Sequence, residues 1–133
     1  MLFVDMRQAL RTALLFAAAL LMGFAALVSA TISVPHLRED MLEINVRLTL
    51  LAAVSLGLYF GVFAMFAFTG LVLVAAVQSA RAAVTVRLPL VIIAATYVGF
   101  GVVAFGWSGS RHTLGHVLIG LLILGAVAIR EFR

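Results

Sequence analysis

The chain has 133 residues, of which 65% are hydrophobic and 11% are charged, with a formal net charge of +4. A soluble domain normally carries about 25% charged residues on its surface, so this composition excludes a water-soluble fold and predicts surroundings of lipid or apolar protein. The nine basic residues are all arginine and are scattered singly, which excludes a nucleic-acid-binding patch, and the absence of cysteine excludes thiolate chemistry.

The first apolar segment, at 12–34, is long enough to cross a membrane as a helix, since about 20 residues suffice. Pro35 follows it and is expected to end the helix. A second interpretation remains open for this segment. Arg7 and Arg11 precede it, and Val28-Ser29-Ala30 resembles a signal-peptidase site, so cleavage there would leave a mature protein with three helices.

A polar connection at 36–47 follows, and it contains histidine and carboxylate side chains at helical spacing. These candidate cation ligands are His36, Glu39, Asp40 and Glu43. The alternative is a solvated connection in which Glu43 pairs with Arg47 at i, i+4. The apolar residues Leu37, Met41 and Ile44 also have helical spacing, which predicts a short interfacial helix within the connection.

The second apolar segment, at 48–77, contains no charged residue and would make a helix of about 45 Å. Two crossings need about 40 residues, so the segment predicts one long, tilted helix rather than a hairpin. Gly57 and Gly61 form a GxxxG pair within it, a spacing that permits close approach of helix backbones. We predict helix packing at this pair, either within the chain or in a dimer.

The third and fourth apolar segments lie at 88–107 and 113–129. Pro89 suits the first turn of a helix, and Trp107 suits the headgroup region of a membrane. His112 and His116, at i, i+4 between and within these segments, are further candidate metal ligands. The alternative for the two histidines is a polar helix start at the headgroups.

Together these segments predict an all-α fold: a single transmembrane domain over residues 1–133, with four transmembrane helices in an antiparallel bundle. Four crossings place six arginines on one side, namely Arg7, Arg11, Arg81, Arg87, Arg130 and Arg133. The other side receives Arg38, Arg47 and Arg111. Because basic residues are enriched on the cytoplasmic side, both termini are predicted to be cytoplasmic.

The apolar segments contain no Asp, Glu, Lys or Arg, which argues against proton-coupled transport, because such transport requires a titratable group within the membrane. Haem binding between helices would require a histidine deep within at least one other apolar segment, and none is there. A catalytic site would require converging titratable groups. The sequence therefore predicts a protein that is not an enzyme and has no cofactor and no metal site, unless the histidine and acidic side chains of the two connections bind a cation.

The second half of the chain has a distinctive layout from Gln78 onward. It comprises Arg87-Leu-Pro-Leu90, the apolar third segment, Gly109-Ser-Arg-His-Thr113 and Leu118-Ile-Gly-Leu-Leu-Ile-Leu124. With four helices and an acidic first connection, this layout resembles the PsiE-like family of small bacterial membrane proteins, named for phosphate-starvation induction. The resemblance implies a four-helix protein of the inner membrane and supplies no catalytic residues.

The leading hypothesis is a non-enzymatic inner-membrane protein with an accessory or stress-related role. One alternative is a small subunit of a larger respiratory or transport complex, and another is a self-assembling channel or holin-like protein. The expected partners are the lipid bilayer and, in the alternatives, other membrane subunits or further copies of the chain.

Overall fold

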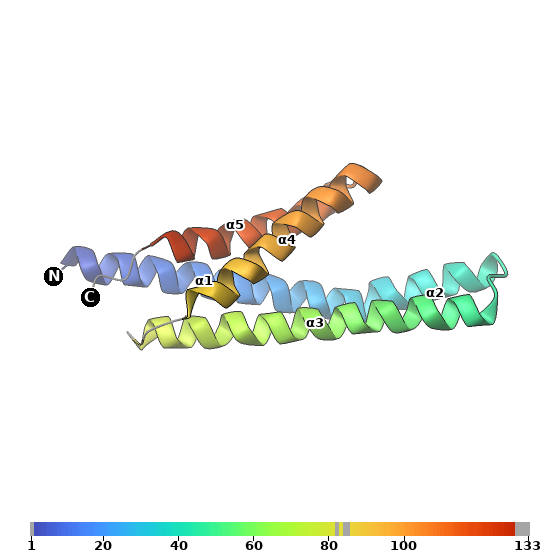
Figure 1. The fold of residues 1–133 in the computed structure, drawn as a ribbon, viewed down its shortest axis with the longest axis horizontal. Helices are drawn as coiled ribbons and strands as arrows, with labels where there is room; N and C mark the ends of the chain where they lie inside the picture. The colour runs from blue at the N-terminus through green and yellow to red at the C-terminus, as the bar shows by residue number, and fades with distance from the viewer. Residues whose placement is uncertain (1, 82, 84–85, 130–133) are drawn as a thin grey trace. The chain divides into compact units, whose positions relative to one another are not determined.

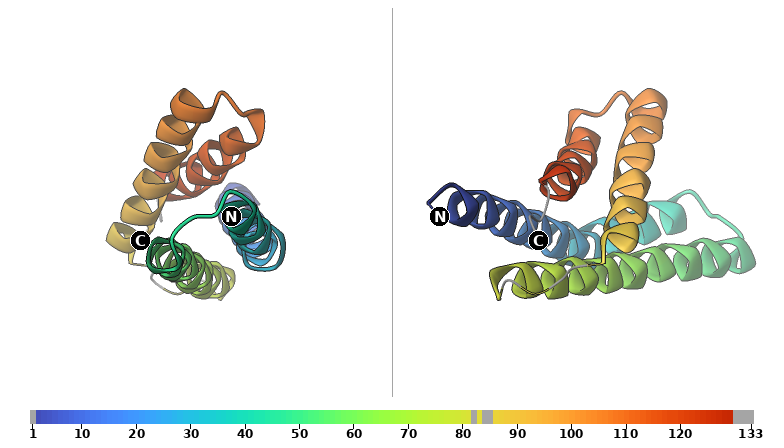
Figure 2. Two further views of the ribbon diagram at one scale, coloured as in Figure 1. Left: turned by 90° about the vertical axis from the view of Figure 1, so that its right-hand side faces the viewer. Right: turned by 60° about the vertical axis from the view of Figure 1, so that its left-hand side comes forward.

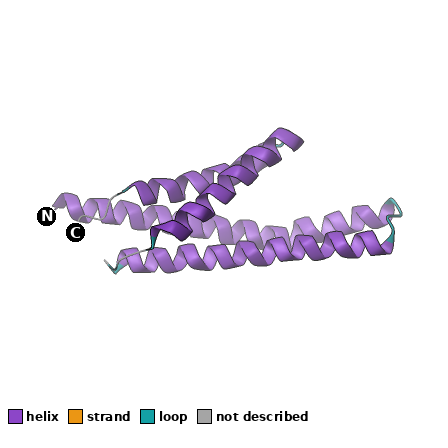
Figure 3. Cartoon of the chain, viewed as in Figure 1, coloured by secondary structure: helices purple, strands orange, loops and turns teal. Residues whose placement is uncertain are grey.

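The computed structural model describes residues 2–81, 83 and 86–129, and all regular structure within them is helical (Figure 3). The elements are α1 (Leu2–Val28), η1 (Ser29–Ser33), α2 (Val34–Glu43), α3 (Leu48–Ala80), α4 (Arg87–Ser108), η2 (Arg111–Thr113) and α5 (Leu114–Ala128) (Figure 1). Four helical stretches of the described chain, at 6–43, 48–80, 87–108 and 111–128, are long and apolar enough to cross a membrane. This confirms the prediction of four such helices.

The helix that begins with α1 does not end at Pro35, so that expectation was wrong. The π-helix η1 connects α1 directly to α2, and Pro35 lies in the first turn of α2. The backbone N–H of Val34 donates to the carbonyl of Ser29, five residues earlier. A proline ring clashes with the carbonyl four residues before it, and the wider π turn gives that carbonyl room. The helical path therefore continues into the predicted polar connection.

The chain reverses direction between α2 and α3 at a tight turn centred on Asn45. Asn45 has a φ of 56°, in the left-handed region that asparagine tolerates better than most residues. Its N–H donates to the carbonyl of Leu42 at 3.1 Å, and the N–H of Val46 donates to that of Met41 at 3.1 Å. This pair of bonds forms a Schellman motif, which ends α2.

The chain divides into two compact units, of which the second comprises residues 22–69. This unit contains the end of α1, then η1, α2 and most of α3. The side chains of Met22, Ala26, Val34, Leu51 and Val62 are buried. The unit is thus a helical hairpin that closes at the Asn45 turn.

The first unit comprises residues 1–21 and 70–133, and so contains the beginning of α1, the end of α3, α4 and α5. Its buried side chains include Leu15, Val72, Ile93 and Ile123. Helices α4 and α5 are joined by η2 (Figure 2). Gly109 has a φ of 64° and its N–H donates to the Phe105 carbonyl at 2.8 Å, so it ends α4 as a left-handed cap.

Candidate functional site

Four of the candidate cation ligands lie on α2, and all four are exposed: His36, Glu39, Asp40 and Glu43. His36 Nδ1 lies 3.8 Å from Glu39 Oε2, and the two side chains are 72% and 71% exposed. Pairs as exposed as this one are screened by water and contribute little to stability. The helical spacing expected from the sequence is therefore present, but the side chains project away from the packed surface of the hairpin.

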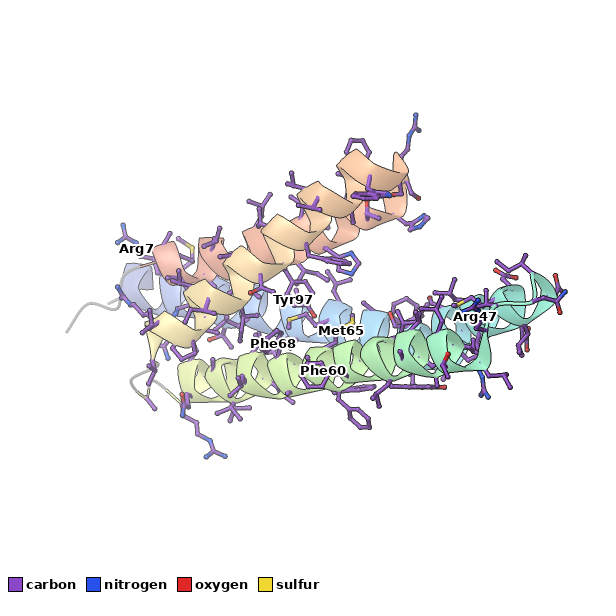
Figure 4. The ribbon with its side chains drawn as sticks, turned by 45° about the vertical axis from the view of Figure 1, so that its right-hand side comes forward. Arg7, Arg47, Phe60, Met65, Phe68 and Tyr97 are labelled. Atoms are coloured by element: carbon purple, nitrogen blue, oxygen red, sulfur yellow. The ribbon has the colours of Figure 1, made fainter. Side chains whose placement is uncertain are left out.

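The expected i, i+4 pair between Glu43 and Arg47 does not form, and its premise of a continuous helix was wrong. Glu43 is the last residue of α2, and the Asn45 turn separates it from Arg47. No ion pair joins them among the described residues. Arg47 instead precedes α3, where its backbone carbonyl accepts a hydrogen bond from the Leu51 N–H at 3.0 Å (Figure 4).

His112 lies on the exposed η2 turn and is hydrogen-bonded to Ser110. Ser110 Oγ lies 2.8 Å from Nδ1 and 3.0 Å from Nε2 of the imidazole. The sequence analysis did not connect these two residues, although their separation by two positions was the available signal. In the Ser-His-Asp arrangement a carboxylate orients the imidazole, and no described carboxylate bonds to His112. The pair is a surface turn contact.

His116 lies on α5 and packs against two aromatic residues of α4. Its ring stacks on Tyr97 with the centroids 5.9 Å apart, and it meets Phe100 edge-on at 5.1 Å. Tyr97 is only 4% exposed, and its hydroxyl has no hydrogen-bond partner among the described residues. The two histidines therefore have different surroundings: His112 is bonded to its own turn, whereas His116 joins α4 to α5 through ring contacts.

No group of three or more His, Cys, Asp or Glu side chains is arranged to hold a metal ion in the described part of the chain. His36, Glu39, Asp40 and Glu43 belong to the second unit, whereas His112 and His116 belong to the first.

The sequence did not reveal a buried polar contact between α1 and α3. Gln8 Nε2 donates to the Ser79 carbonyl at 2.9 Å, and the hydroxyls of Thr12 and Ser79 lie 2.8 Å apart. We call Gln8, Thr12 and Ser79 the polar clasp. Ser79 is 2% exposed, and Arg11, next to Thr12, is 3% exposed. The i, i+4 spacing of Gln8 and Thr12 was the available signal, although Thr12 was assigned only to the start of the apolar segment 12–34.

The glycines at which helices approach closely are not the predicted pair. A Cβ added at Gly57 or Gly61 would have no described atom within 4 Å beyond its own helix backbone. By contrast, a Cβ at Gly101 would lie 2.9 Å from the backbone nitrogen of Val117, and one at Gly120 would lie 2.7 Å from the Ala94 carbonyl oxygen. Packing of Gly57 and Gly61 within the chain is not observed, and packing against another molecule stays a prediction.

The two close approaches also define how α4 and α5 run. Gly101, late in α4, meets the beginning of α5, and Gly120, further along α5, meets an earlier part of α4. The helices are therefore a hairpin. Tyr97, which stacks on His116, lies between the two glycine contacts on α4, and His116 precedes Val117 on α5.

Comparison of the chain with protein-family models, characterised proteins and solved structures finds no match. The PsiE-like resemblance accordingly stays a prediction.

Proposed function

We propose that the chain is a multi-pass protein of the bacterial inner membrane, in which the four long helices form an antiparallel transmembrane bundle. The observation that carries this proposal is the combination of four apolar helical stretches with large apolar side chains exposed along them. On α3, Leu56, Phe60 and Phe63 are 73–75% exposed. Such a surface would aggregate in water, whereas it is well suited to contact with lipid acyl chains.

We place both termini on the cytoplasmic side, because the expected topology gives that side six of the nine arginines. Arg130 and Arg133 lie outside the described residues. The chain contains no cysteine, so single cysteines can be introduced for labelling. With an impermeant maleimide on intact spheroplasts, Asn45→Cys and Ser110→Cys should be labelled and Ala83→Cys protected. Equal labelling of all three would contradict the topology.

We propose that α1 is retained in the mature protein. Leu15 and Ala18 of α1 are fully buried, and the polar clasp bonds α1 to α3. Loss of α1 would expose these apolar contacts and leave Ser79 without its hydroxyl partner. Intact-mass measurement of the purified protein should give the chain with its first 30 residues, and a mature N-terminus at Thr31 would contradict retention.

We assign the protein an accessory, non-enzymatic role, as the PsiE-like resemblance implies. The second candidate, a subunit of a larger membrane assembly, is favoured by the uncovered glycine pair on α3, because Gly57 and Gly61 leave room for another helix. Purification in mild detergent separates the two. Stoichiometric foreign subunits would support the assembly, whereas a pure chain without partners would support the accessory role.

A further inference from the structure

The polar clasp gathers arginines at one end of the first unit. Gln8 bonds to Ser79, so Arg7, which precedes Gln8, and Arg81, which follows Ser79 by two residues, lie at the same end. Arg7 is labelled in Figure 4. α4 begins at Arg87, within seven residues of the end of α3 and in the same unit. The beginning of α1, the end of α3 and the beginning of α4 thus each contribute an arginine to one end of this unit.

Two of these arginines are available to a partner. Arg81 and Arg87 are both exposed, and no carboxylate pairs with either within the described residues. In the topology expected from the sequence, the segments on the side of Arg7, Arg81 and Arg87 carry six arginines but only two carboxylates, Asp5 and Glu131. The segments assigned to the opposite side carry three arginines and three carboxylates, so the whole net charge of +4 belongs to the first set of segments.

The surroundings of Arg87 indicate what kind of partner fits. Its neighbours Val86 and Leu88 are 69% and 68% exposed. A guanidinium group between two exposed apolar side chains suits the boundary where acyl chains meet headgroups. A soluble acidic protein bound there would pair with the Arg87 charge but would leave the apolar side chains of Val86 and Leu88 in contact with water.

We propose that this end, which we call the arginine collar (Arg7, Arg81 and Arg87), binds the phosphate headgroups of anionic phospholipids. A guanidinium group presents paired N–H donors that match two phosphate oxygens, and its charge is retained at every physiological pH. The anionic cytoplasmic leaflet attracts basic residues beside transmembrane helices. This proposal rests on the proposed membrane insertion and adds a class of lipid to it.

The test uses the full chain reconstituted in nanodiscs of phosphatidylcholine, with and without phosphatidylglycerol. The anionic lipid should raise the Tm of the protein, and native mass spectrometry should show phosphatidylglycerol retained in preference to phosphatidylcholine. The double variant Arg81→Gln/Arg87→Gln should lose most of the rise in Tm. The matched control Arg38→Gln/Arg47→Gln, which removes two arginines from the mixed-charge side, should keep it.

Several outcomes would overturn the proposal. If the two double variants lose the rise in Tm equally, the effect is one of general charge. If the wild-type chain does not retain phosphatidylglycerol in preference to phosphatidylcholine, a lipid site is excluded, even if a variant fails to fold. The same rise in Tm from inorganic phosphate in phosphatidylcholine discs would identify a free-anion site instead. Release of the chain from native membranes by alkaline carbonate would overturn membrane insertion as well, whereas stable insertion without a lipid effect would overturn the lipid site alone.

Discussion

Gly120 of α5 lies so close to Ala94 of α4 that a Cβ at position 120 would come within 2.7 Å of the Ala94 carbonyl oxygen. The obstacle is backbone, which cannot rotate away as a flexible side chain can. A second close approach, between Gly101 and the backbone of Val117, lies at the other end of the contact. The α4–α5 hairpin therefore depends on the absence of a side chain at two positions.

We expect Gly101→Ala and Gly120→Ala each to destabilise the protein by roughly 1–3 kcal/mol, the usual cost of overpacking. Unfolding in mixed detergent micelles would measure the change in free energy. Gly99→Ala is the matched control, because it lies two residues from Gly101 on the same helix and meets nothing within 4 Å. Alanine favours helix, so the control should be neutral or slightly stabilising. Equal losses at 99 and 101 would refute the role of close packing.

A second prediction concerns the polar clasp. Thr12→Val and Ser79→Ala each remove one hydroxyl of the pair, and a double-mutant cycle should give a coupling energy of about 0.6–1.7 kcal/mol, the range for interhelical hydrogen bonds in membrane proteins. Thr96→Val is the control, since the Thr96 hydroxyl donates to the Ile92 carbonyl of its own helix. Additive effects of the two clasp substitutions would show that the hydroxyls do not act as a pair.

The sequence predicts those helix ends that are determined by residues next to them in the chain. The start of α3 at Leu48 is predicted because Arg47 is followed by a run without charge. The ends of α4 are predicted to within one residue, because Pro89 favours the start of a helix and Gly109 ends one through its own backbone conformation. Pro35 misleads, because a π turn accommodates a proline that would otherwise end a helix.

Contacts between helices were harder to predict for a physical reason. In a soluble protein the apolar face of a helix shows which side packs, but α3 and α5 are apolar on nearly every face. The sequence therefore cannot distinguish Gly61, which faces open space, from Gly101, which faces α5. The stack of Tyr97 on His116 is missed for the same reason, because the rotation of one helix against the other determines it.

A third prediction follows from the buried hydroxyl of Tyr97. A buried polar group without a hydrogen bond is costly, so Tyr97→Phe should raise the free energy of unfolding by roughly 1 kcal/mol while preserving the ring stack with His116. Tyr59→Phe is the control, because Tyr59 is 39% exposed and its change should be neutral. A marked loss of stability in Tyr97→Phe would show that the hydroxyl has a partner in the membrane, such as a bound water or lipid group.

The final prediction separates the two possible roles of the glycine pair on α3. Gly61→Leu adds a side chain where no described atom of the chain lies within 4 Å of the new Cβ, so the free energy of unfolding of the monomer should not fall. If a second helix packs against Gly57 and Gly61, the leucine would hold the two backbones apart and reduce self-association. Size-exclusion chromatography with light scattering in mild detergent would measure the oligomeric state. Gly70→Leu is the matched control, because Gly70 lies on the same helix, also meets no atom within 4 Å, and falls outside the GxxxG spacing. A smaller oligomer in Gly61→Leu alone would assign this face to assembly, whereas unchanged size in both variants would assign it to lipid.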